Sequence, residues 1–316
     1  MDPVQRMINR LEAGAATCAC GGYLSQLDAL HRTEIYTSLG YERLKRKNDN
    51  IQTVYAASLE NWNQTFYTLL LHYLGAPNNS HAFETLASRV PYAVILRYGR
   101  SLRSLEALLI GTSGLLDSYC DDEYTLTLKS EFSYLAHKHG ITPMSPSEWK
   151  TTRIYPHNHP VIRMAQAAAF LAQRNFVMES ILECRTAKDA ATLFGVEASE
   201  YWTSHFVPAQ TSSESVKRIG PAKANILGIN VVAQLQYAYG SYIGDDRLRD
   251  RAITLLENTQ PENNSRIDRW KANGVVPANA FETQALLQLG NEYCMNGRCR
   301  ECPIGRRIIG TLSKPE

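Results

Sequence analysis

The hydrophobic positions of this 316-residue chain recur with the 3.6-residue period of α-helices along most of its length. One stretch places five large apolar side chains on a single helical face: Phe66, Leu69, Leu70, Tyr73 and Leu74. Glycine, proline and capping residues interrupt such runs, and no alternating pattern of useful strand length lies between them. The pattern predicts an all-α protein of about a dozen helices, packed as an irregular multi-helix array.

The distribution of small residues and prolines predicts two helical lobes. Residues 1–22 run into an alanine- and glycine-rich stretch, so we expect a flexible lead-in. Residues 23–142 then form an N-terminal lobe, and residues 161–316 form a C-terminal lobe that ends in a short cysteine-rich loop. Between them, residues 143–160 contain four prolines, which forbid a continuous helix. We therefore predict that this segment is a hinge.

Composition and charge exclude few classes of protein. The chain is 44% hydrophobic and 20% charged, as ordinary globular proteins are, and its formal net charge is +2. Charge therefore gives no preference for nucleic acid over protein as a partner. No apolar run approaches the roughly 18 residues that span a bilayer, and the N-terminus lacks a signal-peptide pattern. We expect a cytoplasmic protein with no membrane partner.

Three cysteines within nine residues carry the clearest chemistry: Cys294, Cys299 and Cys302. In this C-x4-C-x2-C spacing, Gly297 allows a tight return and the short second gap lets two thiolates converge on one ion. Four arginines flank the loop and are expected to lower the pKa values of its thiols: Arg298, Arg300, Arg306 and Arg307. The pattern predicts a zinc or iron–sulfur centre. The alternative is three reduced thiols that hold no metal.

Such a centre needs a fourth ligand from elsewhere in the chain. Cys184 is the first candidate, and Cys120 and His205 follow it. Cys18 and Cys20 form a C-x-C pair in the small-residue lead-in, and we predict that they are ordinary thiols rather than ligands.

Polar residues at the start of the helix predicted over residues 161–173 form a second candidate site. Arg163 and Gln166 lie one turn apart, near a helix start, where polar side chains can meet an anion. Arg153 precedes them in the proline-rich segment. These three residues are candidate contacts to an anion or a partner, and structural capping of the hinge is the alternative.

Seven stretches form a pattern when they are taken together and in order: residues 41–47 (YERLKRK), 61–67 (NWNQTFY), 105–111 (LEALLIG), 149–153, 162–166 (IRMAQ), 197–202 (EASEYW) and 293–305. This pattern resembles the bacterial domain of unknown function family twenty-eight fifty-one, and the resemblance covers most of the chain from about residue 40 onward. Members of that family generally have a further strand-rich N-terminal half, which we expect to be absent here. The resemblance implies membership but no activity.

A second resemblance concerns the cysteine loop. Residues 298–304 are similar to the iron–sulfur loop of the endonuclease-III-like DNA glycosylases, and residues 218–225 are similar to their helix-hairpin-helix turn. That family's loop has four cysteines with a longer first gap, and its hairpin has two glycines where this chain has only Gly220. Lys223 lies one position from the family's lysine nucleophile, and Asp245 is a loose match to its acidic partner. The resemblance implies a DNA-acting enzyme.

The sequence contains no P-loop, no G-x-G-x-x-G after a strand, no H-E-x-x-H and no G-x-S-x-G. We therefore predict a non-catalytic helical binding or interaction module with a metal-binding cysteine cluster. One alternative is a DNA-acting enzyme with an iron–sulfur loop, so the question of catalysis stays open. Another is a scaffold subunit without metal.

Overall fold

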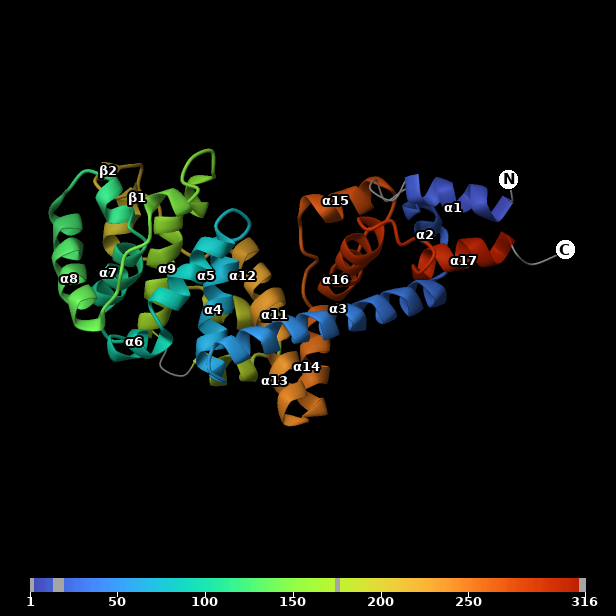
Figure 1. Ribbon diagram of the computed structural model, residues 1–316, viewed down its shortest axis with the longest axis horizontal. Coiled ribbons are helices and arrows are strands. Elements are labelled where there is room, and N and C mark those ends of the chain that lie inside the picture. Colours follow the sequence, from blue (N-terminus) through green and yellow to red (C-terminus); the bar gives the residue numbers. More distant parts are fainter. Residues whose placement is uncertain (1–2, 14–19, 174–176, 313–316) are drawn as a thin grey trace. The chain divides into compact units, whose positions relative to one another are not determined.

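The computed structural model describes residues 3–13, 20–173 and 177–312, and these residues are mostly helical (Figure 1). The prediction of an all-α multi-helix array is confirmed. In this described part, strands are limited to β1 (His205–Val207) and β2 (Gln210–Thr211), which pair antiparallel. Within the same ranges, none of the helices combines the length and the hydropathy that crossing a bilayer requires.

The chain divides into two compact units. Unit 1 comprises residues 1–50 and 237–316, and unit 2 comprises residues 51–236. The helices α3 (Ala29–Ala57) and α13 (Ala233–Ile243) contribute residues to both units. Unit 1 therefore combines the two ends of the sequence.

Unit 1 contains, besides parts of α3 and α13, the following elements: α1 (Pro3–Ala13), α2 (Gly21–Gln26), α14 (Asp246–Glu257), α15 (Ser265–Ala272), α16 (Ala280–Gln288), the π-helical turn η7 (Leu289–Cys294) and α17 (Pro303–Leu312). The predicted lead-in is thus helical over much of its length, while residues 14–19 lie outside the described part. Helix α1 packs against α17 (Figure 1).

Gly40 lies inside α3 and does not interrupt it. A Cβ atom at this position would lie 2.3 Å from the ring of Phe281 on α16. Because the glycine leaves that space free, the two helices of unit 1 approach closely. Its role is packing rather than helix termination.

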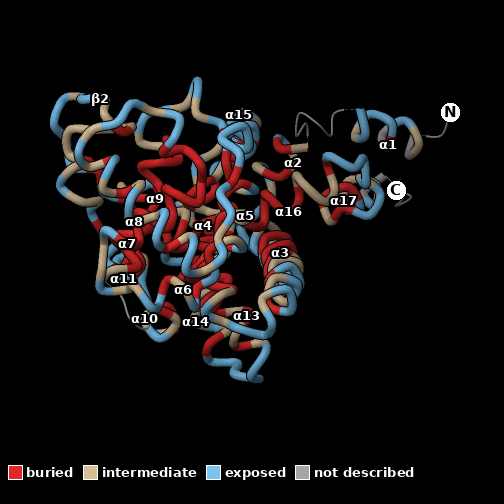
Figure 2. Tube along the Cα trace, turned by 60° about the vertical axis from the view of Figure 1, so that its left-hand side comes forward, coloured by how far each residue is buried: buried red, intermediate tan, exposed pale blue. Residues whose placement is uncertain are grey.

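Unit 2 holds the remaining elements: α4 (Trp62–Gly75), α5 (Ser80–Arg89), α6 (Tyr92–Arg97), α7 (Leu102–Thr112), η2 (Leu115–Ser118), α8 (Glu123–His139), η3 (Pro146–Glu148), η4 (Pro156–Asn158), α9 (Pro160–Gln173), α10 (Val177–Glu183), α11 (Ala187–Phe194), η5 (Glu200–Ser204), β1, β2, α12 (Pro221–Leu227) and the π-helical turn η6 (Gly228–Val232). Helix α9 is the core of this unit and is buried along almost its whole length (Figure 2). It packs against α4 and α7, and its Phe170 stacks on Phe194 with ring centroids 5.4 Å apart.

Residues 143–160, predicted as a hinge between lobes, lie within unit 2. Trp149 is buried there, and its indole Nε1 donates a hydrogen bond to the Ser113 carbonyl at 2.9 Å. The prolines do end regular helix, as expected, but the segment packs onto the unit through its large side chains. The division into units therefore differs from the predicted lobes.

A buried carboxylate on α7 fixes part of the loop structure of unit 2. Glu106 is 1% exposed and accepts hydrogen bonds from Trp202 Nε1 at 2.9 Å, from Ser199 Oγ at 2.8 Å and from the Tyr124 hydroxyl. Burial raises the pKa of Glu106, and the three hydrogen bonds oppose that shift only in part. These hydrogen bonds thus hold residues 199–202 against the buried helix α7.

Candidate metal centre

Four cysteines of unit 1 line one small cavity: Cys20, Cys294, Cys299 and Cys302. Its volume is about 20 Å3, which is the space of about one water molecule. The structure thus brings the three predicted cysteines together and adds Cys20, which the sequence had indicated to be an ordinary thiol.

Three of the four cysteines lie where a helix begins or ends. Cys20 immediately precedes α2, Cys294 is the last residue of η7, and Cys302 immediately precedes α17. Cys299 lies in the turn between the latter two. Gly297 in that turn has φ +63°, so the tight return uses the left-handed conformation that favours glycine.

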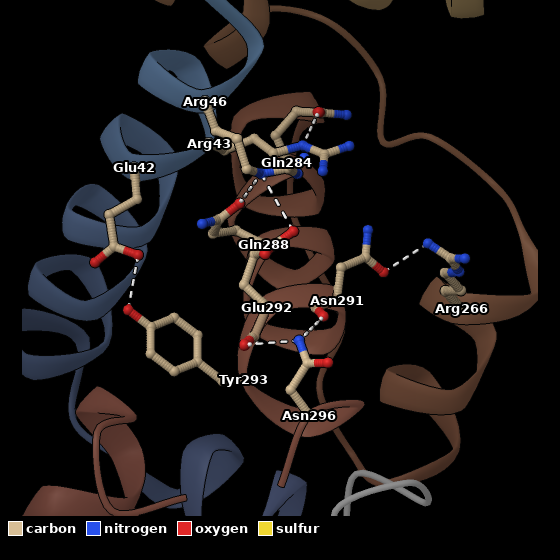
Figure 3. A network of polar contacts seen from close by, with 10 residues as sticks. All are labelled: Glu42, Arg43, Arg46, Arg266, Gln284, Gln288, Asn291, Glu292, Tyr293 and Asn296. Carbon is tan, nitrogen blue, oxygen red and sulfur yellow. Dashed lines mark hydrogen bonds and ion pairs between the residues drawn. The ribbon is translucent and has the colours of Figure 1, made fainter. Parts of the chain in front are cut away.

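Polar contacts hold η7 against α3 within unit 1, and Figure 3 shows this network. The Tyr293 hydroxyl donates to the Glu42 carboxylate at 2.9 Å. Arg46 of α3 donates to Gln288 Oε1 at 3.2 Å and pairs with Glu292 at 3.3 Å. These contacts fix the element that delivers Cys294 to the cavity.

The start of α17 packs tightly on the cysteine turn. A Cβ atom on Gly305 would lie 1.9 Å from the Cys299 carbonyl oxygen, so this position requires glycine. The backbone of Ile304 and of Gly305 hydrogen-bonds to the Cys302 thiol and favours its ionised form. This arrangement supplies part of the outer hydrogen bonding that thiolate ligands usually have.

Burial is the largest influence on the pKa values of two of these thiols, Cys299 and Cys302. It raises the pKa of Cys302 to about 11 and also raises the pKa of Cys299. A hydrogen bond with Cys294 lowers the pKa of Cys20. The expectation that the flanking arginines lower the thiol pKa values is therefore wrong for Cys299 and Cys302, because burial is the largest influence on both and their thiol and carboxylate neighbours raise the pKa further.

Three of those arginines instead face carboxylates of unit 1: Arg298 pairs with Glu301, Arg300 with Glu12 and Arg307 with Glu34. The pairs with Glu12 and Glu34 connect the C-terminal segment to α1 and α3. Because all these side chains are largely exposed to solvent, the pairs contribute little to stability.

Among the side chains that the structure describes, no group of three or more histidine, cysteine, aspartate or glutamate residues already has the arrangement of a metal site. Cys20 and Cys294 instead hydrogen-bond to each other.

The other predicted ligands lie elsewhere. Cys184, Cys120 and His205 belong to unit 2 and do not line this cavity. Cys184 is buried at the end of α10, where its carbonyl accepts a hydrogen bond from Gln236 at 2.7 Å, and Cys120 is exposed. Cys18 lies outside the described residues.

The predicted anion contacts separate into a buried pair and one exposed residue. Arg163 Nη1 donates to Gln166 Oε1 at 2.8 Å inside unit 2, and Gln166 Nε2 donates to the Arg218 carbonyl at 3.0 Å. Arg153 is exposed, with φ +56°. Arg163 and Gln166 are therefore joined by a hydrogen bond inside unit 2, and Arg153 takes no part in these contacts.

The glycosylase-like hairpin is not formed. Residues 212–219, which precede Gly220, are not helical, so the first helix of a helix-hairpin-helix is missing from this described segment. Lys223 lies in α12 of unit 2, whereas Asp245 caps α14 in unit 1. This part of the second resemblance is wrong.

Comparison with known proteins identifies a family but no characterised relative. The sequence model of the family described as "Protein of unknown function (DUF2851)" matches residues 1–265. The match includes Cys20 and stops before the other three cysteines of the cavity. Neither the curated proteins nor the solved structures contain a significant match. Because the family match covers most of its length, the chain belongs to the DUF2851 family.

Proposed function

We propose that the chain is a non-catalytic helical binding module in which one metal ion, bound by Cys20, Cys294, Cys299 and Cys302, stabilises unit 1. The observation that carries this proposal is the shared cavity, which four thiols from opposite ends of the sequence line together. Four thiols are a complete ligand set for a structural zinc site.

The size of the cavity favours a single ion. Thiolates lie about 2.3 Å from zinc, so the sulfurs of a tetrahedral site are about 3.8 Å apart. The cavity of about 20 Å3 and the direct contact between the Cys20 and Cys294 thiols fit that spacing. An iron–sulfur cluster brings its own irons and sulfides and needs more space. Zinc is therefore the metal that we propose.

Ligation by four cysteines also indicates what the ion does. It leaves no coordination position for water or substrate, so the centre is structural rather than catalytic. Binding breaks the Cys20–Cys294 hydrogen bond and releases protons. The ion would then connect α2 to the start of α17, much as structural zinc stabilises small interaction domains.

Metal analysis of protein purified without oxygen tests the proposal. We expect about one zinc per chain, no colour, and loss of the zinc in Cys20→Ser and in Cys302→Ser. Cys120→Ser, which removes an exposed thiol of unit 2, is the matched control and should keep the metal.

Two outcomes would overturn the proposal. Brown protein that contains iron and sulfide would show that the centre is an iron–sulfur cluster rather than a zinc site. Metal-free wild type that takes up no added zinc, with unchanged melting of Cys20→Ser, would favour the scaffold without metal.

A further inference from the structure

A pocket of about 490 Å3 lies inside unit 2. Its walls come from the turn after α4, from η4, from the first turn of α9 and from residues 216–226. Its volume falls in the range of small-molecule sites. The pocket is separate from the cysteine cavity and shares no residue with it.

Two buried cations line this pocket. Arg163 is 5% exposed and Lys223 is 8% exposed, and among the described residues no aspartate or glutamate lines the pocket with them. Arg218 at the rim pairs with Glu197, which is not part of the lining. Burying two like charges without a counter-charge is costly. The site is therefore complementary to an anion.

The contacts of the two cations orient them but do not neutralise them. Arg163 donates to Gln166 Oε1 at 2.8 Å and to Asn158 Oδ1 at 2.6 Å, and its buried Nε has no partner. Lys223 Nζ donates to the carbonyls of Tyr73 and Ala76 at 3.1 and 2.9 Å. Since an ammonium group has three donors, one remains for a ligand.

The aromatic side chains of Tyr155 and His157 form another part of the lining. The rings of Tyr155 and His157 stack with centroids 5.3 Å apart, and Phe206 lies edge-on to His157 at 5.0 Å. Tyr155 is 67% exposed, so a planar group can reach its ring. Burial and the charges of Lys217 and Arg163 lower the pKa of His157, which leaves it neutral at neutral pH.

We propose that this pocket binds a small phosphate ester with a planar group, of the size of a mononucleotide. The phosphate accepts hydrogen bonds from Arg163 and Lys223, and the planar group lies against the Tyr155–His157 pair. Arginine and lysine recognise phosphate through charge-assisted hydrogen bonds, and aromatic rings stack on bases. This inference concerns unit 2 alone and does not depend on the metal centre.

Calorimetric titration of the whole protein with three probes tests the chemistry. We expect adenosine 5′-monophosphate to bind, inorganic phosphate to bind more weakly, and adenosine to bind least. Equal affinities for the monophosphate and for adenosine would overturn the phosphate assignment. Much tighter binding of a 5′-phosphorylated oligonucleotide would show that the pocket recognises the end of a nucleic acid rather than a small molecule.

Substitutions then locate the site. Arg163→Gln and Lys223→Met should each weaken monophosphate binding by roughly 10-fold or more, because each removes a charge-assisted hydrogen bond. Arg153→Gln removes an exposed cation of the same unit that does not line the pocket, and it should bind as the wild type does.

Tyr155→Ala keeps the test decisive if a buried substitution impairs folding, because Tyr155 is exposed. It should weaken monophosphate binding several-fold and leave inorganic phosphate binding unchanged. Wild-type affinity in folded Arg163→Gln, or in Tyr155→Ala, would refute this site.

Discussion

Replacing Glu106 with alanine tests how unit 2 holds the loop that follows α11. The carboxylate accepts hydrogen bonds from Trp202 at 2.9 Å, from Ser199 at 2.8 Å and from Tyr124. Trp202 is fully buried, whereas Ser199 and Tyr124 retain some access to solvent. Alanine therefore leaves one indole N–H without an acceptor, while the two hydroxyls can turn to water.

The magnitude follows from these contacts. A buried donor without a partner costs about 1–3 kcal/mol, and the cavity left by the missing side-chain atoms adds about 1–2 kcal/mol. We expect Glu106→Ala to lower the free energy of unfolding by about 3 kcal/mol, which corresponds to a melting shift of roughly 6–12 °C for a unit of this size. Glu200→Ala, an exposed glutamate in the same loop, is the control and should stay within about 0.5 kcal/mol of the wild type.

The same carboxylate gives stability a pH dependence. Burial raises the pKa of Glu106, so the folded chain holds this proton more tightly than the unfolded chain does. Its contribution is therefore most favourable below the ordinary glutamate pKa and declines as the pH rises through the raised value. Glu106→Gln cannot ionise, so the stability advantage of the wild type over it should shrink as the pH rises from the ordinary glutamate pKa through the raised value.

Urea unfolding of wild type and variants across that pH range measures both effects. If Glu106→Ala destabilises the protein no more than Glu200→Ala does, the buried network is not what holds the loop. An advantage over Glu106→Gln that grows with pH would show that hydrogen bonding outweighs burial at this carboxylate.

Gly305→Ala should lower both the zinc content and the melting temperature, because a Cβ there would lie 1.9 Å from a backbone oxygen, whereas Gly310→Ala in the same helix has open space and should raise stability by about 0.5–1 kcal/mol. Equal zinc content in the two variants would contradict this. A strong chelator should lower the melting temperature of the wild type by several degrees but leave Cys20→Ser unchanged in calorimetry, and an equal effect on both would count against the centre. Burial and Arg163 lower the pKa of Lys223 to about 7, so monophosphate binding should take up protons and weaken as the pH rises above that value. Titration in buffers of different ionisation enthalpy detects the uptake, and its absence would mean that Lys223 is already charged or lies outside the site.

The helices could be predicted because their signals are local. Asn61 accepts hydrogen bonds from the backbone of residues 63 and 64, and Asp122 accepts one from the backbone of Thr125. Such caps act over three positions, and the 3.6-residue period of buried positions acts over one or two turns. A single sequence shows both.

The division into units could not be predicted in the same way. The boundaries after residues 50 and 236 fall inside the helices α3 and α13, where neither proline nor glycine marks them. The proline-rich segment was predicted to be a hinge because prolines end helices. The structure places it within unit 2, where Trp149 is buried and hydrogen-bonds to Ser113, 36 residues away. Local signals in the sequence indicate the backbone conformation of each segment. Packing between residues that are distant in the sequence determines which helices belong to the same unit.

The sequence did not indicate Cys20 as a candidate ligand for the same reason, because its position depends on long-range packing. Its local context is a C-x-C pair among alanines and glycines, which carries no metal-ligand spacing. Its proximity to Cys294 follows from the way unit 1 brings both ends of the chain together. The useful signal was that the C-terminal loop supplies only three ligands, so the predicted centre required a fourth ligand from elsewhere in the sequence.

The two proposed sites belong to different units and share no lining residue, so each serves as a control for the other. Effects at sites without shared partners usually add within a few tenths of a kcal/mol. Cys20→Ser should therefore abolish zinc binding and leave the affinity for adenosine 5′-monophosphate within about twofold of the wild type. Arg163→Gln should do the reverse. Measuring zinc content and monophosphate affinity for both variants tests whether the two sites are independent. If Cys20→Ser also lost nucleotide affinity while unit 2 stayed folded, the sites would be energetically coupled, and the helices α3 and α13, which contribute residues to both units, would be the first elements to test for that coupling.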